Sequence, residues 1–331
     1  MDFDADGTLD LISGSYDPGE LYLFRGRGEG DFDPPEVIKD RDGRPILKVP
    51  DQKDRVESFG SWTTLVDWDY DSDLDILVGT FDGLIFLRRN QGTRAEPAYA
   101  TANEWVKVGE KPLRLPGGEH ANPVTCDWDG DGRWDIVAGA ADGGVYWYRN
   151  AGRPGHPEFE APVTLVAKHE GMGYSELLVP GRDPVPGIRA QIAVTDYDGD
   201  GELDVLLGDF GTYLHVRADL TPEEARAFEE LREKEAEATK FLRDSMESLR
   251  AKYAEDMKGI PQSEWNTPEN SAKWQEAYTA MRESPDYKRY TEEYERVQKE
   301  GLAYVDRTVA GMRLGDDPAV AHGYVWLFRR K

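Results

Sequence analysis

The stretch DWDGDGRWDIVAGAADGGVYWYRN, residues 127–150, joins an acidic loop to two β-like segments. Aspartates stand at the alternate positions 127, 129 and 131, glycine follows at 132, and another aspartate stands at 135. The runs that follow residues 135 and 143 are rich in branched and aromatic residues, which favour β-strands. The stretch therefore predicts a strand–turn–strand unit that is preceded by a loop of closely spaced carboxylates.

The same pattern recurs along the chain, which has 331 residues. Acidic loops begin at Asp2, Asp67, Asp127 and Asp196, at intervals of 65, 60 and 69 residues. Similar β-rich runs follow the first three loops (19–26, 83–90 and 143–150), and strand-like segments precede the last three (61–66, 122–126 and 190–195). Antiparallel strands repeated at this period predict a mainly β fold, a β-propeller of four-stranded blades. A β-sandwich and a solenoid are the alternatives.

The composition changes near residue 220, where the chain becomes highly charged and poor in glycine. Thr221-Pro222, Thr267-Pro268 and Ser284-Pro285 each place a hydroxyl side chain before proline, which is typical of a helix start. Apolar residues then recur at helical spacing on both sides of a central break. We expect an α-helical hairpin here, inserted in the last repeat.

Residues 323–330, GYVWLFRR, resemble residues 19–26 of the first repeat, GELYLFRG. We therefore interpret the fourth repeat as split: its second strand ends near Gly208, the helices intervene, and its third strand lies at the end of the chain. The alternative takes residues 212–216 as that third strand.

The favoured division is residues 1–210 as propeller blades, 211–319 as the helical insertion and 320–331 as the closing strand. The first repeat has only Met1 where the others have an inner strand, so we expect the natural polypeptide to extend upstream. This extension would also explain why no signal peptide is visible in the sequence.

The loops have the chemistry of a calcium site. Ca²⁺ takes six to eight oxygen ligands in flexible geometry, and alternating aspartates in a tight turn direct several carboxylates inward. Glycine at the sixth position permits the turn, the carbonyl at the seventh adds an oxygen, and the ninth residue closes the shell. The predicted ligands are Asp2, Asp4, Asp6, Thr8 and Asp10; Asp67, Asp69, Asp71, Asp73 and Asp75; Asp127, Asp129, Asp131, Arg133 and Asp135; and Asp196, Asp198, Asp200, Glu202 and Asp204.

Other interpretations of the loops remain open. Mg²⁺ demands octahedral geometry and retains its waters, while Zn²⁺ prefers histidine and cysteine. An acidic turn without any metal is the plainest alternative. In the second loop Ser72 replaces the glycine, so it must adopt a conformation that glycine takes more easily. The sequence predicts up to four bound Ca²⁺.

With its D-x-D-x-D-G-x-x-D loops, the chain resembles the FG-GAP/VCBS-type repeats, which form the calcium-loop propeller blades of integrin α-subunits and of many bacterial extracytoplasmic proteins. The resemblance covers about two thirds of the chain. It implies calcium binding and a location outside the cytoplasm, whether periplasmic, cell-surface or secreted. Extracellular calcium at millimolar levels suits loops of this kind.

Charge and composition exclude some classes of partner. The formal net charge of −25 opposes binding to nucleic acid or to anionic membranes, and no apolar run is long enough to insert in a membrane. The single cysteine, Cys126, excludes intramolecular disulfides.

We identify no catalytic constellation and expect a non-enzymatic binding or scaffolding module for an unknown protein or glycan. The alternatives are a polysaccharide-binding or polysaccharide-degrading, lyase-like propeller and a purely structural surface protein. A ligand site at the starts of the inner strands would involve Trp62, His120, Arg189 and Gln191.

Overall fold

A computed structural model describes the chain except for residues 50–58, 170–175, 179–183, 260–266, 307, 310–311, 314–319 and 331. Its described part is mainly β, with several antiparallel sheets and three α-helices. The chain divides into two compact units. Unit 1 comprises residues 1–176, 184–212 and 321–331 and contains the repeat sheets; unit 2 comprises residues 177–183 and 213–320 and contains the helices.

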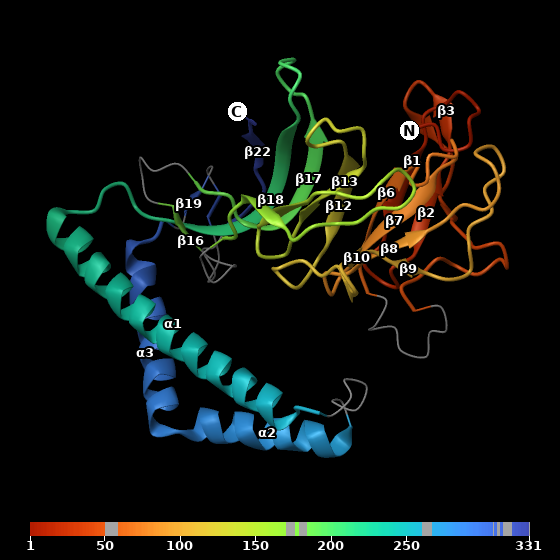
Figure 1. The fold of residues 1–331 in the computed structure, drawn as a ribbon. Coiled ribbons are helices and arrows are strands. Elements are labelled where there is room, and N and C mark those ends of the chain that lie inside the picture. The colour runs from red at the N-terminus through yellow and green to blue at the C-terminus, as the bar shows by residue number, and fades with distance from the viewer. Residues whose placement is uncertain are drawn as a thin grey trace. The chain divides into compact units, whose positions relative to one another are not determined.

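Each sequence repeat forms one antiparallel sheet, and we number these sheets 1 to 4 in chain order (Figure 1). Sheet 1 contains β1 (Leu11–Gly14), β2 (Leu21–Phe24) and β5 (Glu36–Val37). Sheet 2 contains β6 (Ser61–Val66), β7 (Asp75–Thr80), β8 (Ile85–Arg88) and β9 (Glu104–Trp105). Sheet 3 contains β12 (Asn122–Cys126), β13 (Asp135–Gly139), β14 (Val145–Tyr148) and β15 (Val163–Val166). Sheet 4 contains β17 (Ile188–Thr195), β18 (Asp204–His215) and β22 (Val325–Phe328), with β16 (Glu176–Leu178) and β21 (Val320–His322) also paired with β18.

Short two-stranded hairpins complete the described strands. They are β3 (Gly26–Gly28) with β4 (Asp31–Phe32), β10 (Lys107–Val108) with β11 (Lys111–Pro112), and β19 (Thr308–Val309) with β20 (Met312–Arg313). Only sheets 2 and 3 have the four consecutive strands that the repeat pattern predicts. In sheet 1, β1 is an edge strand, although Met1 pairs with Asp10 through two backbone hydrogen bonds of 2.7 and 3.2 Å, much as Val66 pairs with Asp75 in sheet 2.

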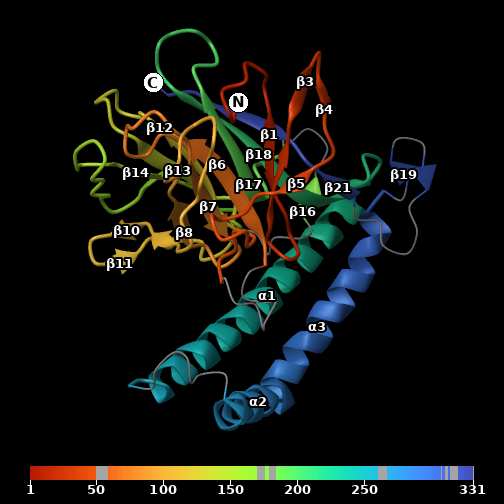
Figure 2. The same ribbon diagram turned by 90° about the vertical axis from the view of Figure 1, so that its right-hand side faces the viewer.

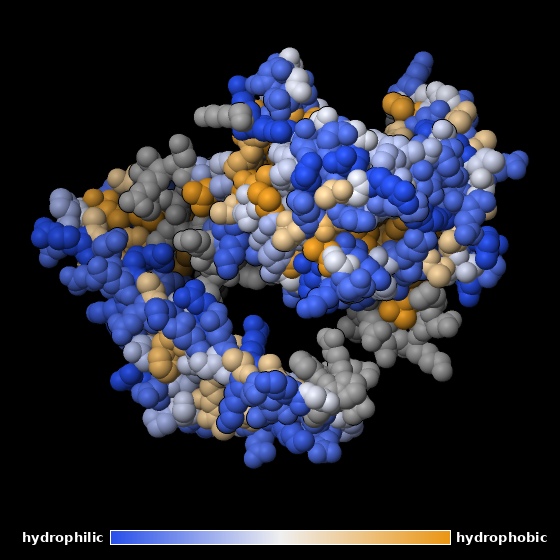
Figure 3. Space-filling view, in the orientation of Figure 1, coloured by the Kyte–Doolittle hydropathy of each residue, from blue (hydrophilic) through white to orange (hydrophobic). Residues whose placement is uncertain are grey.

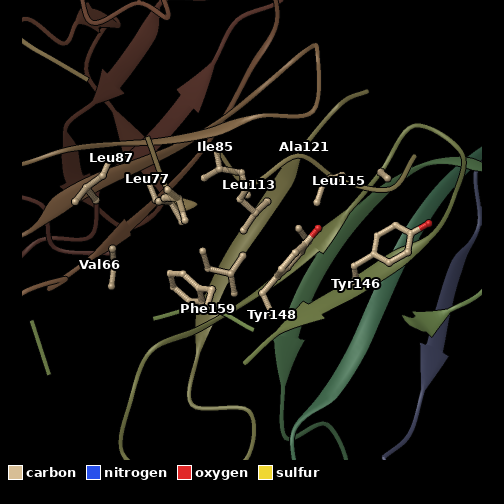
Figure 4. Packing of buried hydrophobic residues seen from close by; sticks show 14 of the residues in the cluster. Val66, Leu77, Ile85, Leu87, Leu113, Leu115, Ala121, Tyr146, Tyr148 and Phe159 are labelled. Atoms are coloured by element: carbon tan, nitrogen blue, oxygen red, sulfur yellow. The ribbon is translucent and has the colours of Figure 1, made fainter. Parts of the chain in front are cut away.

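Successive sheets pack face to face through apolar side chains. We call the face that contacts the next sheet along the chain the forward face, and the opposite one the backward face. Leu77 and Leu87 on the forward face of sheet 2 share a buried cluster with Tyr146 and Tyr148 on the backward face of sheet 3 (Figure 4). Ile136, also on the backward face of sheet 3, belongs to the same cluster. Similar clusters join sheet 1 to sheet 2 and sheet 3 to sheet 4. Each fully buried side chain of this size contributes roughly 1.5–3 kcal/mol, so these interfaces supply much of the stability of unit 1.

A glycine at or next to the end of the second strand of sheets 2 and 3 has a packing role. A Cβ atom built on Gly79 would lie 1.9 Å from the carbonyl oxygen of Ala121, at the start of sheet 3, and one built on Gly139 would lie 2.4 Å from that of Ala190. At this junction the Ala121 N–H donates a hydrogen bond of 3.0 Å to the Thr80 carbonyl. The glycine therefore lets the inner strand of the next sheet begin against the backbone of the previous one.

Sheet 4 brings together segments that are far apart in the sequence. The strand beside β18 is β22, with Leu206 paired to Leu327 and Gly208 to Val325. The segment 212–216 does not supply this strand. Instead β18 runs on to His215, so the expectation that the second strand ends near Gly208 is wrong. The longer strand is possible because residues beyond Gly208 also find pairing partners.

Unit 2 contains α1 (Pro222–Asp256), α2 (Pro268–Glu283) and α3 (Pro285–Gly301), followed by a short 3₁₀ turn, Leu302–Tyr304. The predicted helix starts are confirmed: the side chains of Thr221, Thr267 and Ser284 cap the three N-termini. The returning arm of the predicted hairpin consists of two helices, α2 and α3, which meet at Ser284 and Pro285. α1 packs against α3 (Figure 2). Between them the Phe241 and Tyr290 rings stack with their centroids 4.1 Å apart. Among the described helices, none is both long and apolar enough to cross a membrane.

Candidate metal centres

Each acidic loop gathers carboxylates at the end of a sheet. One oxygen from each of three aspartates lies within 4.8 Å of the other two in every loop. In loops 1 to 3 these are the first three aspartates, and in loop 4 the closing aspartate takes the place of the third. The clusters are Asp2, Asp4 and Asp6; Asp67, Asp69 and Asp71; Asp127, Asp129 and Asp131; and Asp196, Asp198 and Asp204.

The first aspartate accepts the same two backbone hydrogen bonds in loops 2 to 4, and one of the two in loop 1. In loop 3 the two carboxylate oxygens of Asp127 accept the N–H groups of Asp131 and Gly132, both at 2.9 Å. The fourth and sixth residues of every loop have positive φ: Ala5 and Gly7, Tyr70 and Ser72, Gly130 and Gly132, Gly199 and Gly201. Ser72 thus takes the glycine-like conformation, at φ 77°. These turns bring the carboxylates of the first three aspartates to one side of the loop.

The seventh residues were predicted to offer carbonyl ligands, and their N–H groups are already engaged. Each donates to the carboxylate of the third aspartate: Thr8 to Asp6 at 2.7 Å, Asp73 to Asp71 at 3.0 Å, Arg133 to Asp131 at 3.1 Å and Glu202 to Asp200 at 2.9 Å. These hydrogen bonds fix the backbone that carries the four carbonyls. Their coordination of a cation stays a prediction.

The closing aspartate ties each loop to the end of a neighbouring strand. One oxygen accepts a backbone N–H in all four copies: Gly26 to Asp10 at 2.8 Å, Asn90 to Asp75 at 2.7 Å, Asn150 to Asp135 at 2.6 Å and Arg330 to Asp204 at 3.0 Å. Asp75, Asp135 and Asp204 are buried. This residue therefore latches the loop onto the sheet, a role that the sequence pattern did not indicate.

An arginine next to this latch contacts the second aspartate of every loop. The pairs are Arg25 with Asp4, Arg89 with Asp69, Arg149 with Asp129, and Arg329 with Asp198. Sequence reasoning missed these arginines, although the signal was present: each follows the third strand at the same place in the repeat. Their guanidinium groups offset part of the negative charge and hold the second aspartate in position.

Charge remains uncompensated in spite of these arginines. Two carboxylates less than 5 Å apart repel by about 3 kcal/mol at an effective dielectric constant of about 20. Burial, with lesser contributions from neighbouring aspartates, raises the pKa of Asp73 to about 6 and that of Asp75 to about 7. Several buried carboxylate oxygens have no hydrogen-bond partner: Oδ1 of Asp2, Asp4, Asp73 and Asp129, and Oδ2 of Asp75.

Such oxygens fit a hard cation. Buried polar atoms are nearly always paired, and Ca²⁺ is bound by carboxylate and carbonyl oxygens. The first three aspartates of loops 1 to 3 supply the carboxylates, and no described histidine or cysteine joins any of the four clusters. The residues present therefore fit calcium better than zinc.

The residues predicted as a ligand site lie at the opposite ends of the inner strands. His120 is buried and its ring stacks on Trp62, with centroids 5.2 Å apart, while Arg189 lies over the ring of Phe210. Gln191 is exposed and pairs with Gly208. His120 and Arg189 have positive φ, and their N–H groups donate to the preceding sheet. They thus turn the chain into the next sheet.

An open groove of about 380 Å³ lies beside β1, near this end of the sheets. It is lined by β1 residues together with Tyr16, Ser61, Trp62, Thr63 and Asn122. The hydroxyl oxygen of Thr63 is buried and has no hydrogen-bond partner. Of the predicted ligand-site residues, only Trp62 lines this groove.

Comparison with known proteins agrees with the geometry of the loops. Residues 127–207 match a family model described as FG-GAP-like repeat, and this segment contains the third loop, strands β13 to β15 of sheet 3, β17, the fourth loop and the first residues of β18. No curated protein matches the chain. Loops 1 and 2 lie outside the matched segment, but the hydrogen bonds of their seventh residues and closing aspartates are the same as in loops 3 and 4. The chain therefore contains FG-GAP-like repeats over residues 127–207.

Proposed function

We propose that this protein is a calcium-binding module built on a β-propeller, which binds a partner outside the cytoplasm and catalyses no reaction. The observation that carries the calcium assignment is the set of buried carboxylate oxygens without hydrogen-bond partners in loops 1 to 3. The face-to-face packing of successive sheets supports a propeller, in which each sheet would be one blade. Millimolar calcium outside the cytoplasm would keep loops of moderate affinity filled.

Calcium would act as a structural clamp. Each ion removes two units of the formal charge of −25 and relieves the repulsion within one loop. The loop lies between the first two strands of its sheet and is latched to the end of the third. A filled loop therefore fixes one end of the sheet, and the other end remains available for a partner.

The test compares calcium-free protein with protein to which Ca²⁺ or Mg²⁺ is added back. Calorimetric titration should show up to four bound Ca²⁺, and the melting temperature should rise with calcium more than with magnesium. Each calcium site should raise the free energy of unfolding by about 2.7 kcal/mol when free calcium is present at 100 times the Kd of the site. Asp127→Asn should remove one bound ion, whereas Asp31→Asn, an equal charge change at an exposed residue outside the loops, should remove none. Melting that is indifferent to millimolar calcium would show the loops to be metal-free turns.

A second candidate partner is a glycan, and the groove beside β1 favours it. Aromatic rings next to hydroxyl and amide groups suit a sugar ring, and the groove has the rings of Tyr16 and Trp62 beside Ser61, Thr63 and Asn122. A glycan array with wild type and Trp62→Ala tests this candidate. Binding that Trp62→Ala leaves unchanged would place the glycan elsewhere.

A further inference from the structure

The two terminal sheets of unit 1 each keep one apolar face that no other sheet covers. In the three internal interfaces a forward face always packs on a backward face. The backward face of sheet 1 and the forward face of sheet 4 have no such neighbour within the described residues. Figure 3 shows apolar residues exposed in the region of β18 and β22 and beside the N-terminus.

The backward face of sheet 1 has the composition of a covered face. The first residue after the closing aspartate is Leu11, Ile76, Ile136 or Val205 in the four repeats. Leu11 is 49% exposed, while Ile76 and Ile136 are 0% and Val205 is 2% exposed. The residue two positions further along this strand pairs with an aromatic residue of the neighbouring strand in every copy: Tyr22, Phe86, Tyr146 and Trp326. Leu11 of sheet 1 is thus exposed to solvent at a position where sheets 2 to 4 bury the corresponding side chain.

The forward face of sheet 4 shows the same mismatch. The glycine four residues after the closing aspartate pairs with Leu21, Ile85, Val145 or Val325 in the four repeats. The first three are fully buried, whereas Val325 is 76% exposed. Leu206 and Leu327 lie beside it and are half-buried, while the equivalent Leu77 and Leu87 of sheet 2 are buried.

Repeat arrays that end in solvent normally carry polar residues on their terminal faces, and exposed apolar patches mark interaction sites. Here the two terminal faces are the two halves of one kind of interface, which the chain already forms three times. We propose that the forward face of sheet 4 packs on the backward face of sheet 1 in a second copy of this chain. A heterologous contact of this kind generates a ring when the rotation closes. Two copies with four sheets each reach the upper end of the usual propeller range of about four to eight blades.

Self-association is independent of whether the loops bind calcium, so it can be measured with calcium and with chelator. Light scattering during size-exclusion chromatography, over a wide range of protein concentrations and at moderate salt, should give twice the chain mass of 37.3 kDa. Leu11→Lys and Val325→Lys should each reduce the mass to one chain. Val163→Lys is the matched control, because Val163 and Leu11 have the same exposed fraction, 49%, but Val163 lies on the outer strand of sheet 3. Unchanged circular dichroism of all three variants would show that they fold.

Mixing the two variants distinguishes this contact from an isologous contact, in which both copies would use the same face. Leu11→Lys keeps an intact sheet 4 and Val325→Lys keeps an intact sheet 1, so an equimolar mixture should form a pair although each variant alone is a monomer. Wild type that is monomeric at every concentration overturns the proposal and leaves a different polypeptide as the occupant of the faces. Loss of association in Leu11→Lys but not in Val325→Lys also overturns it, in favour of two sheets 1 packed back to back. A calcium titration without binding would overturn the proposed function and leave this result untouched.

Discussion

Replacement of Gly79 by alanine tests how successive sheets are joined. The new Cβ would lie 1.9 Å from the Ala121 carbonyl oxygen and 2.6 Å from the Pro123 ring. Because Cβ atoms essentially never approach other atoms closer than 3.0 Å, the start of β12 must move away by about 1 Å in a close-packed interface. Overpacking of this kind costs roughly 1–3 kcal/mol, and strain on the hydrogen bond from Ala121 to Thr80 adds about 1 kcal/mol.

Gly208 provides a control at the same position of the repeat. Its Cβ would meet nothing nearer than the Gln191 carbonyl oxygen at 3.6 Å, which is ordinary contact. We therefore expect Gly79→Ala to lower the free energy of unfolding of unit 1 by about 3 kcal/mol, and Gly208→Ala to change it by less than about 0.5 kcal/mol.

Urea unfolding followed by near-ultraviolet circular dichroism reports on the tryptophans between the sheets, and so on unit 1. For a domain of this size the melting temperature of Gly79→Ala should fall by roughly 6–12 °C. Equal stability of the two variants would refute the idea that glycine is required where the first strand of one sheet begins against the backbone of the preceding sheet. It would show instead that the junction yields easily and that the apolar faces alone set the spacing.

Three other substitutions test particular residues. Ser72→Gly should raise the free energy of unfolding by about 1 kcal/mol, because Ser72 has φ 77° and glycine takes this conformation without steric cost; a loss of stability in urea unfolding would contradict this. Thr221→Ala should lower the stability of α1 by about 1 kcal/mol, since the Thr221 side chain caps Glu224 in a capping box; an unchanged helix melting curve at 222 nm would show that the cap contributes nothing. Burial lowers the pKa of His120 below its ordinary value of 6.5, so the unfolded chain binds a proton that the folded protein rejects, and stability should fall as the pH drops through about 6.5. His120→Gln should remove that part of the pH dependence in urea unfolding between about pH 7 and pH 5, and His156→Gln serves as the control; identical profiles for all three proteins would exclude His120 as its source.

Features that depend on nearby residues could be predicted from the sequence. The spacing of the loops, the strands that flank them and the helix starts are local patterns, and Thr221, Thr267 and Ser284 do cap helices. The position of β22 beside β18 could be predicted as well, although the two strands are more than 100 residues apart, because residues 323–330 repeat the residue pattern of 19–26.

Other features depend on contacts that the motif does not contain. The positive φ of Ala5 and Tyr70 follows from the turn that the carboxylates cap, although neither residue type favours that conformation. The role of Arg149 beside Asp129 depends on the end of β14 lying next to the loop, which strand pairing alone decides. The continuation of β18 past Gly208 likewise required partners from distant parts of the chain. Comparison of the repeats position by position, rather than of the acidic motif alone, would have revealed the arginines.

The hydrogen bonds within the loops separate two tasks that the acidic motif presents as one. The closing aspartate is a latch: in loop 3 both oxygens of Asp135 accept hydrogen bonds, from the Asn150 N–H at 2.6 Å and the Trp147 ring N–H at 2.9 Å, whereas in loop 2 Oδ2 of Asp75 has no partner. The first three aspartates form the cluster in loops 1 to 3 and leave Oδ1 of Asp2, Asp4 and Asp129 without a partner. Loss of a cluster carboxylate should therefore weaken cation binding while the sheet persists, whereas loss of the latch should loosen the sheet even without cations. Loop 4 combines the tasks, since Asp204 is both a latch and a member of the cluster. It is the loop in which cation binding and the closure of its sheet, by β22 from the distant end of the chain, should be most strongly coupled.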